Sequence, residues 1–127
     1  MSAEYSFAVD SSRDLLRIRM AGFFTREDII GFAEGLRQAH GLLACPPDAH
    51  VTLNDLRDLK IQSRETVDMF REMLANPQHR SRRLALLVSP TLARSQAMRV
   101  LDGRTVRCFE DAARAEAWLL EPNAAAA

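Results

Sequence analysis

The feature that most constrains the fold of this chain is an alternation of strand-like and helix-like segments after an initial hairpin. Five segments have the apolar pattern of strands: 5–9, 15–20, 51–53, 84–88 and 105–109. Four further segments have helical spacing and begin after Thr25, Ser63, Ser89 and Asp111. Strands that alternate with helices form right-handed crossovers in a mostly parallel sheet. The sequence therefore predicts an α/β fold with a mixed, mostly parallel five-stranded sheet, four helices and the order ββαβαβαβα.

The first two strand segments are joined by polar turn-forming residues and predict an antiparallel hairpin. In the second of them, Leu16, Ile18 and Met20 fall on one face. Arg17 and Arg19 fall on the other, which we expect to be exposed or covered only by polar groups. The free edge of such a hairpin invites self-pairing, so a homodimer is an open alternative to a monomer.

Local residues also mark the ends of the helices. Thr25, Ser63 and Asp111 each stand before a helical pattern and are predicted N-caps. Gly31 and Gly35 lie inside the first helix, where each costs about 1 kcal/mol relative to Ala. Close approach of this helix to the sheet is the expected reason for them.

Composition places the chain among soluble globular proteins. It has 127 residues, 47% hydrophobic residues and zero net charge, which predicts one domain (1–121) with a disordered C-terminal tail (122–127). Zero net charge argues against nucleic-acid binding. No apolar run approaches the roughly 20 residues of a membrane span, and the start lacks a secretory pattern, so we expect a cytoplasmic protein without integral membrane contact. Two cysteines do not predict a disulfide framework.

Several phrases of the chain resemble those of a known family. They are DLLRI at 14–18 leading to GFFT at 22–25, LNDLRD at 53–58, RRLALLV at 82–88, and the segment 109–119. Together they resemble the STAS-like family with the sporulation anti-sigma-factor-antagonist (SpoIIAA-like) fold. The resemblance covers Tyr5 to Leu120 and is nearest to small bacterial stand-alone proteins of this type, many without an assigned role. It implies a regulatory protein that works by binding a protein partner.

The resemblance also draws attention to Ser63. In the antagonist branch of the family, a serine at the start of the corresponding helix is phosphorylated by a partner kinase. That branch has Asp-Ser followed closely by Gly, whereas this chain has Gln62-Ser63-Arg64-Glu65. Ser63 is therefore interpreted first as a helix N-cap and second as a candidate phospho-switch, two roles that are compatible because a helix N-terminus favours a phosphate.

The candidate partner-binding residues are Asp55, Arg57, Asp58, Ser63 and Arg64. We expect the first three in a loop after the short strand 51–53, at the carboxyl end where ligands and partners meet a parallel sheet. Charge complementarity there would give specificity.

Other chemistry is weakly indicated. Asp55 and Asp58 have no further acid or histidine nearby in sequence, so surface ion pairs or loop-capping bonds are expected rather than catalysis. His40, His50 and His79 fall in three segments without the spacing of a helical metal site. We therefore predict no catalytic residue, no metal and no cofactor. The basic residues Arg80, Arg82 and Arg83 are expected in a solvated loop, with an anion or partner patch as the alternative.

The sequence thus predicts a non-enzymatic regulatory or protein-interaction module that binds a partner around Asp55–Ser63. The alternative is a carrier of a small apolar, lipid-like ligand. In that alternative, the helix with Gly31 and Gly35 would border a pocket together with Phe23 and Phe24.

Overall fold

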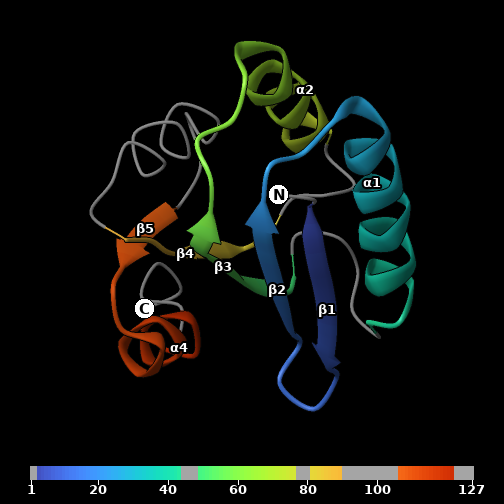
Figure 1. Cartoon of the computed structure of the whole chain (residues 1–127). Helices are drawn as coiled ribbons and strands as arrows, with labels where there is room; N and C mark the ends of the chain where they lie inside the picture. Colours follow the sequence, from blue (N-terminus) through green and yellow to red (C-terminus); the bar gives the residue numbers. More distant parts are fainter. Residues whose placement is uncertain (1–2, 44–48, 77–80, 90–105, 122–127) are drawn as a thin grey trace.

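The structure is a computed structural model that describes residues 3–43, 49–76, 81–89 and 106–121 (Figure 1). Its strands are β1 (Glu4–Asp10), β2 (Leu15–Gly22), β3 (Val51–Leu59), β4 (Arg83–Leu87) and β5 (Val106–Phe109). Its helices are α1 (Arg26–Gly41), α2 (Arg64–Ala75) and α4 (Ala112–Leu119).

The five strands form one mixed sheet in the order β1-β2-β3-β4-β5. β1 pairs with β2 in antiparallel fashion, and the other pairs are parallel, as predicted. Within the described residues the element order is ββαβαββα, with three helices instead of the four predicted. The predicted helix after Ser89 falls on positions 90–105, and the predicted tail on 122–127, both outside the described residues.

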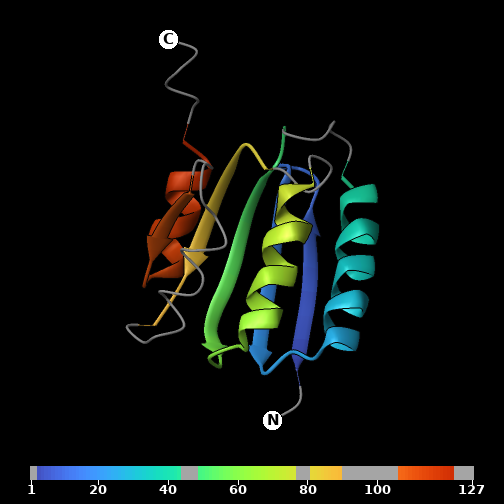
Figure 2. The same cartoon turned by 90° about the horizontal axis from the view of Figure 1, so that it is seen from above.

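Helices pack on both faces of the sheet (Figures 1 and 2). α1 and α2 lie on one face, and α4 lies on the other over β3, β4 and β5. The core under α1 and α2 includes Leu16, Ile18, Phe24, Phe32, Leu36 and Phe70. The core under α4 is built from Leu15, Val51, Leu53, Ala85, Leu87, Ala115 and Leu119. On this face, α4 reaches β2 at Leu15 and pairs through Glu116 with Arg17 at 2.7 Å, whereas Arg19, further along β2, is exposed.

The predicted helix starts at Thr25, Ser63 and Asp111 are confirmed. Thr25 Oγ1 accepts from the Asp28 backbone N–H at 3.2 Å, and the Asp28 carboxylate accepts from Thr25 N–H at 2.9 Å, a reciprocal capping box. Ser63 caps α2 by accepting from Thr66 N–H, and Asp111 caps α4 by accepting from Ala113 N–H. At the end of β2, Gly22 has a φ of 81°, a backbone conformation that favours glycine.

The close approach of α1 to the sheet is also confirmed. A Cβ added at Gly35 would lie 2.6 Å from a ring carbon of Phe7, and one at Gly31 would lie 2.7 Å from the hydroxyl oxygen of Tyr5. Tyr5, Phe7, Phe24 and Phe32 form a connected aromatic cluster below the helix. The two glycines therefore make room for β1 side chains.

The prediction of a loop after Leu53 is wrong. β3 continues to Leu59, so Asp55, Arg57 and Asp58 are strand residues. The polar residues of this segment have low strand propensity, but β2 is long enough to pair with it as far as Gly22 opposite Leu59. A register shift between Arg19 and Ala21 accommodates the irregular part of the ladder.

Candidate functional site

The carboxyl ends of β2 and β3 and the starts of α1 and α2 meet at one end of the molecule (lower edge of Figure 2). We call residues 22–26 and 59–65, which connect these elements, the Ser63 edge. Lys60 N–H donates to the Gly22 carbonyl at 3.1 Å and extends the β2–β3 pairing into this edge. The two connections are therefore held side by side by backbone bonding.

A buried glutamine braces the Ser63 edge from inside. The Gln62 side chain is 6% exposed, and its Oε1 accepts from the Phe24 backbone N–H at 2.9 Å. Its Nε2 donates to the Gly22 carbonyl at 3.0 Å and also to the Lys60 carbonyl. One amide thus satisfies backbone groups of both connections, where an unpaired buried group would cost about 1–3 kcal/mol.

A chain of hydroxyl groups starts from Ser63, which is exposed. Ser63 Oγ accepts from Thr66 N–H at 3.1 Å and donates to Thr66 Oγ1 at 3.0 Å. Thr66 Oγ1, which is buried, donates in turn to the Phe24 carbonyl at 3.0 Å. Ser63 is therefore a true N-cap, worth about 1 kcal/mol, and a modification of its oxygen would act on a bond network that reaches the start of α1.

Two large apolar side chains are exposed on this edge. Phe23 is 40% exposed and Ile61 is 50% exposed, and they flank the braced residues on the two connections. Around them stand exposed charges, with Arg26 of α1 paired to Glu65 of α2 at 3.4 Å. Neither Gln62 nor Ile61 was predicted as a site residue, because neither residue type marks a site until the two connections are known to be neighbours.

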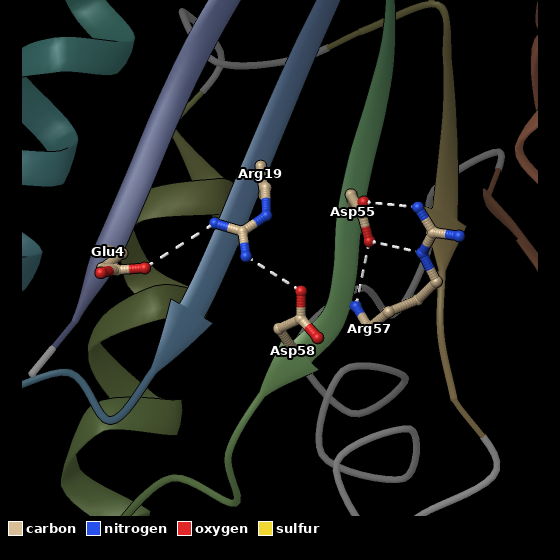
Figure 3. A network of polar contacts seen from close by, with 5 residues as sticks. All are labelled: Glu4, Arg19, Asp55, Arg57 and Asp58. Atoms are coloured by element: carbon tan, nitrogen blue, oxygen red, sulfur yellow. Dashed lines mark hydrogen bonds and ion pairs between the residues drawn. The ribbon is translucent and has the colours of Figure 1, made fainter. Parts of the chain in front are cut away.

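A second polar surface lies on the helix-free part of the sheet, and we call it the open face (Figure 3). Arg19 of β2 lies 2.9 Å from the Asp58 carboxylate of β3 and 4.0 Å from Glu4 of β1. On β3, the Arg57 guanidinium contacts both carboxylate oxygens of Asp55, at 3.0 and 2.8 Å. The expected ion pairs of Asp55 and Asp58 are confirmed.

The five predicted partner-binding residues thus fall on two surfaces. Asp55, Arg57 and Asp58 belong to the open face, and all three lie on β3 (Figure 3). Ser63 and Arg64 belong to the Ser63 edge at the start of α2. The two groups are separated because the first three residues lie along β3, whereas Ser63 and Arg64 follow the end of that strand.

Comparison with known proteins gives the architecture a precedent. No protein-family model and no characterised protein sequence matches the chain. A solved structure of an uncharacterized DUF3478-family protein from Shewanella loihica PV-4, described as having a SpoIIAA-like fold, matches with a TM-score of 0.69 and 22% identity over 92% of this chain and 94% of that one. The chain has a SpoIIAA-like fold. An anti-sigma factor antagonist from Mycobacterium paratuberculosis also matches, with a TM-score of 0.59 and 10% identity over 93% of this chain and 96% of that one.

On this SpoIIAA-like fold, the predicted basic patch is only partly available. Arg83 is half-buried, lies 5.3 Å over the ring of Trp118 and donates to the Trp118 carbonyl. It also lies 3.8 Å from Glu121, so it serves the packing of α4 on β4. Arg82 is half-buried, and Arg80 falls outside the described residues.

Other kinds of site find little support. Among the described residues, no group of three or more His, Cys, Asp or Glu side chains is placed to hold a metal ion. Cys108 is half-buried and packs against the core under α1 and α2, while Cys45 lies outside the described residues. Of the helices that the structure describes, none combines the length and the apolar character needed to cross a membrane.

The Asp55–Arg57 pair predicts a pH dependence. Hydrogen bonding from Arg57 holds the pKa of Asp55 below its ordinary value of 3.8. A carboxyl group with a lowered pKa stabilises the fold above pH 3.8, and this contribution is lost as the pH falls through the folded-state pKa. We expect Arg57→Gln to raise the pKa of Asp55 and to remove part of the acid-induced loss of stability below pH 3.8, measured by carboxyl NMR titration and urea unfolding.

Arg71→Gln is the matched control for this pair. Arg71 pairs with Asp68 on the exposed side of α2 at 3.5 Å, so its removal should leave the pKa of Asp55 unchanged. An unaltered Asp55 pKa in Arg57→Gln would contradict the assigned cause.

Proposed function

We propose that this protein is a non-enzymatic regulatory module that binds a protein partner through the Ser63 edge. The fold is that of a solved anti-sigma factor antagonist, whose name describes a protein that acts on another protein. The observation that carries the proposal is the exposure of Phe23 and Ile61 on connections that Gln62 and Thr66 hold in place. Exposed apolar anchors on a rigid frame bind a partner at a low entropic cost.

Ser63 gives this surface a means of regulation. It is exposed, and it stands at the N-terminus of a twelve-residue helix, where the helix dipole favours an added phosphate. Arg64 and Lys60 are exposed beside it. A phosphate on Ser63 would place negative charge two residues after the apolar anchor Ile61 and would weaken the binding of an apolar partner segment.

The open face would help to orient the protein partner as it binds. Its ion pairs are exposed, and exposed pairs contribute only about 0–1 kcal/mol each to stability. Asp58 is the member nearest in sequence to the Ser63 edge, so a partner that wraps the end of β3 would meet its charge. We propose that Asp55, Arg57 and Asp58 affect the association rate and specificity more than the affinity.

Capture of the protein partner from native cells, with variants of the Ser63 edge, tests the proposal. We expect the double variant Phe23→Ser, Ile61→Ser to lose partner binding by at least about tenfold while it stays folded, because it removes both anchors. Ser63→Glu should also weaken capture. Leu42→Ser is the matched control, since Leu42 is 71% exposed at the other end of α1. Equal capture by the double variant and the wild type would contradict the proposal.

The alternative of an apolar-ligand carrier has no specific observation in its favour. The space beside Gly31 and Gly35 contains the aromatic rings that those glycines admit. A hollow of about 560 Å³ lies elsewhere, at the carboxyl ends of β4 and β5, and its described lining includes charged residues. The homodimer and the cytoplasmic location stay predictions.

A further inference from the structure

The structure brings together two histidines that the sequence places in separate segments. His40 lies in the last turn of α1, and His50 directly precedes β3. Their ring centres are 4.8 Å apart, and the ring planes are inclined by 55°. This pair lies at the amino end of β3, opposite to the Ser63 edge, and takes no part in the proposed partner surface.

The hydroxyl groups of Ser81 and Thr52 form a chain of hydrogen bonds that ends at the His50 ring. His50 is 2% exposed, and its Nε2 lies 3.3 Å from Ser81 Oγ. Ser81 Oγ is in turn 2.6 Å from Thr52 Oγ1. In the tautomer in which Nε2 carries the hydrogen, His50 donates to Ser81 and offers Nδ1 as an acceptor. Metal-binding histidines typically have one ring nitrogen anchored in this way.

The ring spacing fits two ligands of one ion. A metal–nitrogen distance of about 2.0–2.1 Å, with roughly 1.1 Å from the nitrogen to the ring centre, places each ring centre about 3.2 Å from the ion. At bond angles of about 90–110°, two such ring centres are about 4.5–5.2 Å apart. The observed spacing of 4.8 Å lies within this range.

We propose that His40 and His50 are ligands of a site for a divalent transition-metal ion, with Ser81 as the positioning residue of His50. Neutral imidazole suits Zn²⁺, Ni²⁺ and Cu²⁺ and not the hard ions Mg²⁺ or Ca²⁺. The described residues supply these two ligands and no third one. Both histidines have further interactions, so the ion competes for their nitrogens and its affinity is moderate.

Such an ion would also stabilise the fold. His40 lies in the last turn of α1 and His50 precedes β3, so a shared ion would tie the end of α1 to the start of β3. Binding to the folded state alone raises the unfolding temperature. The sequence lacks the histidine spacing of a helical metal site, and the tertiary contact between His40 and His50 takes its place.

Thermal unfolding with added metal tests the site. We expect the Tm of the full chain to rise by about 3 °C or more with millimolar Zn²⁺, to return on chelation, and to stay constant with Mg²⁺. His40→Gln is the first variant, because His40 is only half-buried, and it should weaken Zn²⁺ binding by at least about tenfold. Ser81→Ala should weaken it by about tenfold while keeping both ligands.

Imidazole NMR resonances provide a readout that does not depend on the stability of a variant. Titration of the wild type with Zn²⁺ should shift the resonances of both His40 and His50. No binding at millimolar Zn²⁺, unchanged binding in His40→Gln, or shifts confined to His79 would each overturn the proposal. Binding that saturates, with both rings shifted, supports it.

Discussion

Replacement of Gln62 by alanine is expected to lower the free energy of unfolding by about 2–4 kcal/mol. The substitution removes the acceptor of the Phe24 N–H and the side-chain donor to the Gly22 and Lys60 carbonyls, and the Gly22 carbonyl keeps only its bond from Lys60 N–H. Chemical denaturation measures the loss. Because the same amide positions both connections of the Ser63 edge, partner capture should fall with it even at temperatures where the variant is folded.

Two further variants make this prediction specific. Gln62→Glu keeps an acceptor for Phe24 N–H but sets a carboxylate against the Gly22 carbonyl, which raises the pKa of the new carboxyl group. Its deficit should therefore appear above the ordinary glutamate pKa and shrink as the pH falls and the group becomes a donor. Lys60→Ala, an exposed neighbour whose backbone bonds remain, should change stability by less than about 0.5 kcal/mol. A neutral effect of Gln62→Ala would show that the brace does not hold the edge.

Gly35→Ala is expected to destabilise the protein by about 1–3 kcal/mol although alanine favours helices. The added methyl group would lie 2.6 Å from a Phe7 ring carbon, and that ring contacts Tyr5 and Phe32. Either α1 must move outward from β1 or the aromatic cluster must repack. Thermal unfolding followed by circular dichroism measures the change.

The other glycines of α1 provide graded controls. At Gly31 the nearest atom is the hydroxyl oxygen of Tyr5, a residue 37% exposed and free to shift outward, so Gly31→Ala should cost less. At Gly41 an added Cβ meets nothing within 4 Å, and Gly41→Ala should be neutral or stabilising by up to about 1 kcal/mol. Equal effects at the three positions would contradict packing as the cause.

The two ends of the molecule differ in what they offer. The Ser63 edge presents exposed apolar groups on a braced frame, which suits a partner that binds and leaves under regulation. The histidine pair at the other end is largely enclosed and suits an ion that stabilises the fold. Metal binding and partner binding can therefore be tested separately. The variant Leu42→Ser and the double variant Phe23→Ser, Ile61→Ser change surface groups that are not metal ligands, so neither should change metal binding.

The sequence predicted those features that depend on nearby residues. The hairpin followed from the alternation of Leu16 and Ile18 with Arg17 and Arg19, and it is observed. The caps at Thr25, Ser63 and Asp111 were predicted from residue type and position, because a side chain that bonds an N–H two or three residues away needs no tertiary partner. The unbroken apolar run at 84–88 is typical of a strand covered on both faces, and β4 is buried along Leu84–Leu87.

The sequence could not predict how far β3 extends or which side chains meet across the fold. Asp55 and Asp58 are in a strand because β2 offers a backbone ladder along their whole length, and pairing energy outweighs local propensity. The division of the site between the open face and the Ser63 edge depends on that extension.

For the described residues, what the sequence by itself determined is the five strands and three helices, their order and the starts of the helices, through periodicity and capping within a few residues. Only the tertiary structure decided that Gln62 braces two connections, that Phe23 and Ile61 stand exposed on one edge, and that His40 meets His50. These contacts join residues that only crossover folding brings together, so no local pattern encodes them. The binding chemistry proposed for this protein rests on them.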